Sequence, residues 1–244
     1  MLTVTEAQER ASDLVQSAKQ AGADAADVIY SGGLSTEVQV RLGELEDVQR
    51  SEGEDIGLRF FVGRRSASVS SSDLSPEAMA VLVERAAAMA REAPEDAYAG
   101  LAPEDRLFRG ALPDLDIHDD YAAEPETLRA QALEAEDAAR AVDGVTNSEG
   151  GGTSTGRSIM ALATSHGFCG GYQASSFGCS ASVIAGEGSG MQRDYAYRTA
   201  RHFADLDSPA SIGQRAGERT VARLNPAKLE SGAMPVVFDP RVSG

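Results

Sequence analysis

The sequence predicts an α+β protein, in which an N-terminal domain of antiparallel strands with covering helices is followed by a β-rich middle domain. Three observations lead to this prediction. Apolar residues recur at helical spacing from Ala7 to Ala21, the period then changes to two in "TEVQVRL" and "DIGLRFFVG", and glycine, serine and short apolar runs dominate residues 144–203. Helices that flank antiparallel strands, instead of alternating with parallel ones, are typical of this class.

The N-terminal domain is predicted to span residues 1–92. We expect its first helix to begin at Thr5 as the N-cap and to end at Gly22, which suits the left-handed conformation of a helix stop. The two alternating segments then predict half-buried strands, and the turn "GRR" leads into a partner strand, "SASVS". A second helix is expected after Ser75, with Pro76 at its first position.

Residues 93–124 are dense in Pro, Asp and Glu and predict an acidic, solvated connector. The second domain, residues 125–244, is predicted to contain a helix to about Val142, glycine-spaced strands, a helix near residues 209–224 and a buried strand, "PVVFDP". A strand needs neighbours for its hydrogen bonds, yet little sequence follows this one. We therefore expect the natural polypeptide to continue, so that this domain is truncated and a C-terminal half is missing; an edge strand at a true C-terminus is the alternative.

Composition excludes several classes of function. The formal net charge is −16, and only two of the basic residues are Lys, so binding to a phosphate backbone or an anionic membrane is not expected. No apolar run approaches the ~18 residues of a membrane-spanning helix, and the N-terminus lacks the pattern of a secretory signal. Two cysteines are too few for a disulfide framework, which favours a cytoplasmic location with reduced thiols.

The stretch "EGGGTSTGRS", residues 149–158, differs by one residue from the phosphate-loop pattern G-x-x-x-x-G-K-[ST]. Arg157 replaces the lysine, an acid precedes the glycines, and the following residues lack helical amphipathicity, although a helix is needed after such a loop. The sequence therefore predicts a flexible turn at the start of the β-region and not a nucleotide site. Contact of Arg157 and Ser158 with a partner or a peptide is left open.

A metal site is considered at the only histidine and cysteine residues that lie close in sequence. His166 and Cys169 are spaced like zinc ligands, and Cys179 offers a third. Both cysteines, however, lie in strand-like sequence without a second ligand pair, which favours packing roles. The remaining histidines, His118 and His202, lie far away in sequence and form no H-E-x-x-H pattern.

No other pattern predicts catalysis. Arg64–Arg65 could bind a carboxylate but more simply closes a hairpin, and "GEGSG" is not the G-x-S-x-G nucleophile elbow. The residues alone therefore assign no catalytic, metal-binding or cofactor-binding position, and leave substrate-binding residues unknown.

Four stretches of the sequence resemble the TldD/PmbA family, and in particular its PmbA (TldE) branch. They follow the family order and are distributed between Arg50 and the end of the sequence: Arg50 to Ser75, Thr164 to Gly186, Met191 to Gly232 and Pro235 to Gly244. The third stretch is long and the most specific, whereas the acidic connector contributes nothing.

The resemblance implies a cytoplasmic protein of roughly twice this length. It implies a TldD-type partner subunit in a closed zinc metallopeptidase that degrades unfolded peptides, and the family also carries the label of a DNA gyrase modulator. The zinc motif, H-E-x-x-x-H, belongs to the TldD subunit, and no position here matches it. We therefore expect a PmbA-type subunit without a metal site, whose partner holds Zn²⁺; a non-enzymatic gyrase-type binder, a homodimer and an autonomous hydrolase using His166, Cys169 and Cys179 are the alternatives.

Overall fold

The computed structural model describes residues 1–242, apart from the side chains at positions 104 and 241, and its centre is a six-stranded antiparallel sheet. The strand order is β3-β2-β1-β4-β5-β6. The strands are β1 (Ala25–Arg41), β2 (Glu44–Val62), β3 (Arg65–Ser71), β4 (Val145–Thr164), β5 (Cys169–Ala185) and β6 (Gln192–Ala200). The helices are α1 (Val4–Gln20), α2 (Pro76–Glu92), α3 (Pro125–Arg140) and α4 (Pro209–Val221). The α+β prediction is confirmed.

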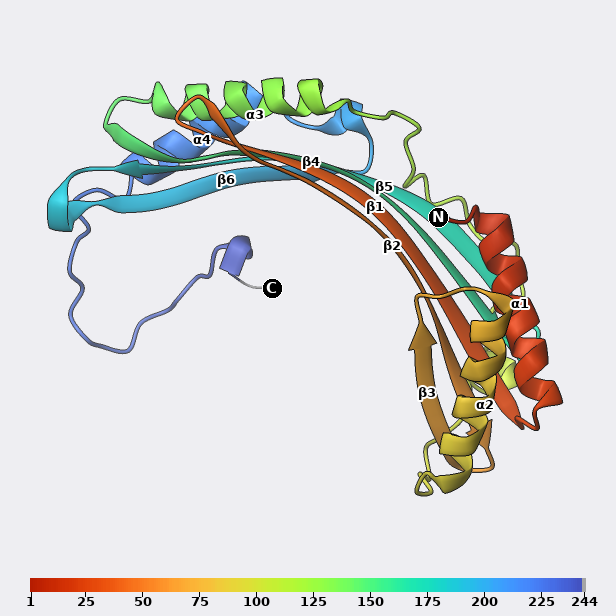
Figure 1. Cartoon of the computed structure of the whole chain (residues 1–244). Helices are drawn as coiled ribbons and strands as arrows, with labels where there is room; N and C mark the ends of the chain where they lie inside the picture. Colours follow the sequence, from red (N-terminus) through yellow and green to blue (C-terminus); the bar gives the residue numbers. More distant parts are fainter. Residues whose placement is uncertain (243–244) are drawn as a thin grey trace.

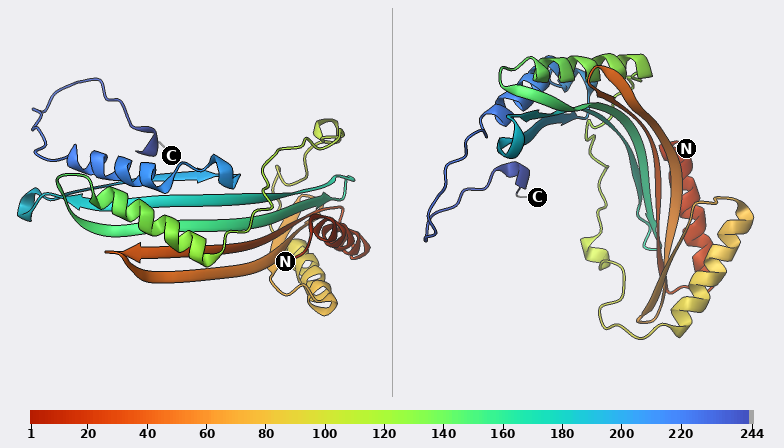
Figure 2. Two further views of the ribbon diagram at one scale, coloured as in Figure 1. Left: turned by 90° about the horizontal axis from the view of Figure 1, so that it is seen from above. Right: turned by 60° about the vertical axis from the view of Figure 1, so that its left-hand side comes forward.

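The sheet forms an arch. Its longest strands bend near their middle, α1 and α2 cover the convex side of one end, and α3 and α4 cover the convex side of the other end (Figure 1). The second view in Figure 2 shows that the chain after α4 turns under the concave side without forming a layer on the sheet. Strand β1 pairs with β4 along most of its length, so strands from both predicted domains join one continuous sheet.

Each end of the arch has its own apolar cluster. The first packs α1 and α2 on β1, β2 and β4, with Tyr30, Phe60 and Ile159 among its buried side chains. The second packs α3 and α4 on β5 and β6 and includes Val183 and Ile212. The helix periodicity read from the sequence identifies these faces correctly, since Leu128, Ala132, Ala135 and Ala139 of α3 are all buried.

The start of α1 differs from the prediction by two residues. Thr3, not Thr5, is the N-cap, and a glutamate stands three residues after it. The Glu6 carboxylate accepts a hydrogen bond from the Thr3 backbone N–H at 2.8 Å, while the Thr3 hydroxyl accepts one from the Glu6 N–H at 3.3 Å. This reciprocal pair satisfies two free helix-end groups. Thr5 is likewise followed three residues later by Gln8, so the sequence contains two capping-box patterns and the helix begins at the earlier one. The predicted stop at Gly22 (φ +95°) and the predicted cap at Ser75 are both present.

The glycine run does not form the predicted turn; it lies inside β4, between β1 and β5. Gly150 has φ +119° beside an irregularity in the β4–β5 register, a conformation that other residues rarely adopt. Gly151 lies under α3, where an added Cβ would come within 2.2 Å of the Ala132 carbonyl oxygen. Gly151 is therefore a glycine because a helix backbone touches the strand backbone there.

The two helices of the second cluster approach each other in the same way. A Cβ on Gly213 would lie 2.0 Å from the Ala135 carbonyl oxygen, and one on Gly217 would lie 2.5 Å from the Val142 side chain. These two glycines are four residues apart and share one face of α4. Close contact of α3 and α4 thus depends on the lack of side chains at both positions.

A buried carboxylate fixes the β1–β2 hairpin to α3. Glu136 is 0% exposed, and its two oxygens accept hydrogen bonds from the backbone N–H groups of Leu42 and Gly43 at 2.7 and 2.9 Å. Burial alone would raise the pKa of Glu136. Hydrogen bonds from Ser148 and from the two amides, together with the charge of Arg140, lower the pKa below its usual value instead. The carboxylate is therefore held ionised at the hairpin tip.

The predicted strand "PVVFDP" is wrong. Residues 235–240 form no strand, and their apolar side chains are exposed, with Val237 at 94%. Burial of a strand requires a neighbouring strand, and none of the described strands lies beside this segment. The last two positions of the matching stretch, 243 and 244, lie outside the described residues. No helix in the described part of the chain is long and apolar enough to cross a membrane.

Candidate functional site

Small polar residues occupy the centre of the concave face. Side chains of a strand alternate between the two faces of a sheet. The register places the following residues from four neighbouring strands on the concave side: Ser31, Gly33, Ser35, Ser51, Gly53, Gly152, Ser154, Gly156, Ser158, Ser176, Gly178 and Ser180. The same strands direct their buried apolar residues mainly to the convex side, under the helices, whereas Ile29 and Leu162 are exposed on the concave face away from its centre.

Three hollows follow one another along β4 on this face. Their volumes are about 440, 240 and 330 Å³, and the last two share Gln39, Gly152 and Ser180. We call their common path the β4 trough, with a floor of Gly152, Ser154, Gly156 and Ser158. At about 3.3 Å per strand residue, this floor is roughly 20 Å long.

One side of the trough carries aromatic and basic residues of the β6 region. Tyr195 and Tyr197 are 40% and 51% exposed, and their rings stack with centroids 6.1 Å apart. Arg193 forms an ion pair with Glu149 at 3.2 Å. Arg201 lines the largest of the three hollows and donates a hydrogen bond to the Ser175 carbonyl at 3.1 Å.

The opposite side is acidic. Glu37 of β1 lines the middle hollow, and the register places Asp47 beside Gln39 and Asp55 beside Ser31 on the same face. Asp47 accepts a hydrogen bond from the Gln49 side chain at 2.6 Å. The trough thus combines hydroxyl donors and acceptors on its floor with carboxylates on one wall and tyrosines on the other.

The arrangement of the trough suits binding. Its serine hydroxyls can donate to and accept from a peptide backbone, and the floor glycines let that backbone approach closely. None of the residues lining the three hollows is a histidine. A nucleophilic serine needs an adjacent base, and among these lining residues no histidine is placed to serve as one.

The comparisons with known proteins agree with this fold. Residues 26–90 match the PmbA/TldA metallopeptidase domain 1, and residues 118–224 match the PmbA/TldA metallopeptidase central domain. Together these two segments of one family cover most of the chain. The chain belongs to the PmbA/TldD family.

Two curated relatives are similar along nearly the whole chain. Metalloprotease PmbA of Escherichia coli O157:H7 is 36% identical over 216 residues, which is 88% of this chain and 48% of the relative. The PmbA homologue of Haemophilus influenzae is 34% identical over 237 residues, 96% of this chain and 51% of the relative. The chain thus spans about half the length of these PmbA relatives.

Two solved structures share the fold. A candidate modulator of DNA gyrase from Bacteroides thetaiotaomicron superimposes with a TM-score of 0.86 at 24% identity, covering 95% of this chain and 53% of that one. TldE from Thermococcus kodakarensis superimposes with a TM-score of 0.72 at 19% identity, covering 85% and 46%. At these identities the likeness concerns the PmbA/TldD fold alone.

The residues considered for a metal site do not come together. Cys169 and Cys179 lie on one strand, so ten residues separate them by roughly 33 Å. Cys169 is exposed, whereas Cys179 is buried, which raises the pKa of its thiol to about 11. Among the described residues, no group of three or more His, Cys, Asp or Glu side chains is placed to hold a metal ion. The three residues considered for zinc are therefore not assembled into one ligand set.

The two residue pairs considered in the sequence, Arg157–Ser158 and Arg64–Arg65, have different surroundings in the structure. Arg157 points to the convex side and donates a hydrogen bond to the Asp120 carbonyl, while Ser158 lies on the trough floor. Arg65 donates to the Arg91 carbonyl at 2.8 Å, and the Arg64 carbonyl accepts from the Asp96 N–H at 2.9 Å. The second pair thus ties the hairpin to the end of α2.

A clasp that sequence reasoning missed lies at the edge of β5. Strand β6 pairs only with residues 177–185 of β5, and the end of the acidic connector, residues 116–121, docks beside the uncovered half. Ser175 donates its N–H to the Ile117 carbonyl at 2.9 Å, and its hydroxyl accepts from the Asp119 N–H at 2.9 Å. The Phe203 N–H donates to the Asp119 carboxylate at 2.8 Å. The clasp protects an open sheet edge.

Two histidines distant in sequence meet at this clasp. His202 contacts both the carbonyl and the carboxylate of Asp116, at 2.9 and 3.3 Å, and His118 contacts Asp120 at 3.1 Å. The hydrogen bond to the Asp116 backbone is the main cause that raises the pKa of His202, with Asp116, Asp119 and Asp205 adding to it. No spacing in the sequence indicates this pair, because the two histidines are far apart in the chain and come to the same clasp only in the folded structure.

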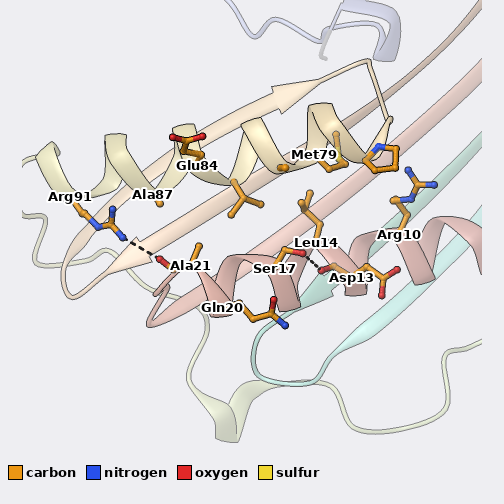
Figure 3. A pocket seen from close by; sticks show the side chains of 13 residues that line it. Arg10, Asp13, Leu14, Ser17, Gln20, Ala21, Met79, Glu84, Ala87 and Arg91 are labelled. Atoms are coloured by element: carbon orange, nitrogen blue, oxygen red, sulfur yellow. Dashed lines mark hydrogen bonds between the residues drawn. The ribbon is translucent and has the colours of Figure 1, made fainter.

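Another hollow, of about 730 Å³, lies between α1 and α2 on the convex side (Figure 3). Arg91 crosses from α2 to the Ala21 carbonyl, and Arg10 crosses from α1 to the Leu74 carbonyl, so that arginines close both ends. The floor side chains, including Leu14 and Met79, are already buried against the sheet. These contacts hold α1 and α2 together above the apolar core.

Proposed function

We propose that this chain is part of a PmbA-type subunit of a two-subunit zinc metallopeptidase that acts on unfolded peptides in the cytoplasm. Its role is to present a binding surface, while a TldD-type partner supplies the metal and the chemistry. The observation that carries the proposal is membership of the PmbA/TldD family combined with an open, polar concave face. The Escherichia coli relative is named a metalloprotease, which supports the reaction class.

The side chains support this assignment of binding to one subunit and chemistry to the other. A peptidase zinc site needs three protein ligands and an open position for water. The described residues offer no such group, whereas the trough offers about 20 Å of hydroxyls and glycines on a rigid sheet. An unfolded peptide exposes its backbone groups, so a hydroxyl-lined floor can bind it without reading a particular sequence.

The test is reconstitution. The chain is mixed with a purified TldD-type protein, and cleavage of a casein-derived unfolded peptide is followed together with the mass of the complex. We expect a stable complex whose activity exceeds that of the partner alone. Equal activity with and without this chain, or no complex at micromolar concentration, would refute the proposal. A homodimer of the chain alone would appear in the same mass measurement.

A second function, non-enzymatic binding of DNA gyrase, is favoured by the name of the Bacteroides protein that shares the fold. Copurification of gyrase with this chain, in the absence of any peptidase partner, would support it. The net charge of −16 makes the gyrase protein, not its DNA, the expected contact.

A further inference from the structure

The β4 trough has the dimensions of a single extended polypeptide. Its floor extends over roughly 20 Å, the length of about six residues in a strand. The floor residues carry at most a hydroxymethyl group, and the flanking positions Gly33 and Gly53 leave open space, since an added Cβ on Gly53 would meet no atom within 4 Å. A peptide backbone can therefore lie against the floor, with side chains directed alternately to the two walls.

The charges along the trough select the kind of peptide. Glu149 and Arg193 neutralise each other. Arg157 and Arg198 also line the hollows, but their guanidinium groups contact the Asp120 carbonyl and the Asp207 carboxylate. The charges that remain beside the trough on the concave face are Glu37, Asp47 and Asp55 on one side and Arg201 on the other. The surroundings of the trough are thus net negative, as is the whole chain at −16. The stacked ring faces of Tyr195 and Tyr197 add a surface for cations and apolar groups.

We propose that the β4 trough binds an extended, basic peptide segment, with its backbone on the serine and glycine floor and its cationic side chains toward Glu37, Asp47 and Asp55. This inference rests on the proposed function, because it assigns that function a substrate class and a site. Unfolded acidic peptides are repelled by the same wall and by the overall charge.

The test measures binding without a peptidase partner. The probe is a fluorescein-labelled peptide of alternating Lys and Ala, about seven residues long, and the matched probe has Glu in place of Lys. Fluorescence anisotropy is expected to show at least ~5-fold tighter binding of the basic probe, with affinity falling as salt rises. Equal binding of both probes, or tighter binding of the acidic one, would overturn the proposal.

Two variants locate the site. Gly156→Val fills the trough floor, since its nearest neighbour is the mobile Ser176 hydroxyl at 2.9 Å, and is expected to weaken the basic probe about tenfold. Gly57→Val is the control on the same face but beyond the trough, and is expected to leave affinity unchanged. Equal effects of the two variants would place the peptide elsewhere.

A third variant keeps the test decisive if valine disturbs the strands. Glu37→Gln changes an exposed side chain, and is expected to weaken the basic probe by about threefold while leaving the acidic probe no weaker. An unchanged basic affinity would contradict the proposed orientation. Removal of residues 233–244 tests whether the chain's own tail occupies the trough. Binding of the basic probe that appears only after this truncation would assign the trough to that tail.

The outcomes separate the two proposals. Failure of the basic probe to bind, combined with peptide cleavage by the reconstituted pair, refutes the trough assignment and leaves the proposed function standing. Selective binding of the basic probe without any complex refutes the two-subunit function and leaves the trough as a peptide-binding site.

Discussion

Two adjacent glycines of β4 provide a sharp test of the packing described above. An added Cβ on Gly151 would lie 2.2 Å from the Ala132 carbonyl oxygen, whereas one on Gly152 would lie 3.1 Å from the Ser180 hydroxyl. A normal contact begins near 3.2 Å, so Gly151→Ala forces α3 and β4 apart by about 1 Å. The Ser180 hydroxyl, in contrast, can rotate away.

We expect Gly151→Ala to lower the free energy of unfolding by about 2 kcal/mol, the usual cost of overpacking a rigid contact. For a chain of this length, this corresponds to a melting temperature lower by roughly 4–8 °C. Gly152→Ala is expected to change stability by less than about 0.5 kcal/mol, because only a mobile hydroxyl must move. Urea unfolding followed by far-UV circular dichroism measures both. Equal losses for the two variants would refute the close approach of α3 to β4.

Three further predictions concern titratable groups. Because the pKa of Glu136 is lowered in the folded state, its contribution to the free energy of unfolding is present above the unfolded pKa of about 4.3 and is lost as pH falls through the folded pKa. Glu136→Gln should therefore lower the free energy of unfolding by about 1–3 kcal/mol at pH 7, as measured by urea unfolding. The difference in stability between the variant and the unmodified chain should shrink in acid. Because the pKa of His202 is raised in the folded state, the clasp should be tightest below about pH 6.5 and should loosen as pH rises through the folded pKa. The rate of trypsin cleavage within residues 101–115, normalised to a denatured substrate, should increase over that range. A His202→Gln variant should lose this pH dependence. A thiol reagent at neutral pH should modify the exposed Cys169 rapidly and the buried Cys179 only on unfolding; rapid reaction of both would contradict the burial.

Local signals in the sequence were sufficient for the helices. Ser followed by Pro marks the starts of α2 and α4, at Ser75 and Ser208, and both serines accept a hydrogen bond from a backbone N–H three residues later. These caps involve neighbours in the chain, so their geometry is encoded within one turn. Alternation likewise located β1 and β2, although their full lengths depend on pairing partners and were underestimated.

The glycine run was misread because the reason for its glycines lies outside the local sequence. Gly151 is small because Ala132, nineteen positions earlier and on a different element, brings its carbonyl oxygen there. Glycine-rich sequence alone indicates a turn, and only the packing of a helix on the strand reverses that interpretation. The trough could not be predicted from the sequence for a similar reason, since its residues come from separate strands and share a face only through the strand register.

The same clusters of small residues argue that the concave face is kept for access and not for stability. Serine and glycine are poor strand formers, and glycine inside a strand costs roughly 0.5–1 kcal/mol relative to alanine. On the trough floor, Gly152 and Gly156 lie under no helix, so the packing that requires Gly151 does not apply to them. Replacing Ser154 and Ser158 with threonine should therefore stabilise the sheet slightly in urea unfolding while weakening the basic peptide, as expected where function opposes stability. A pair of substitutions that raised both stability and affinity would show that the open floor has no role in binding.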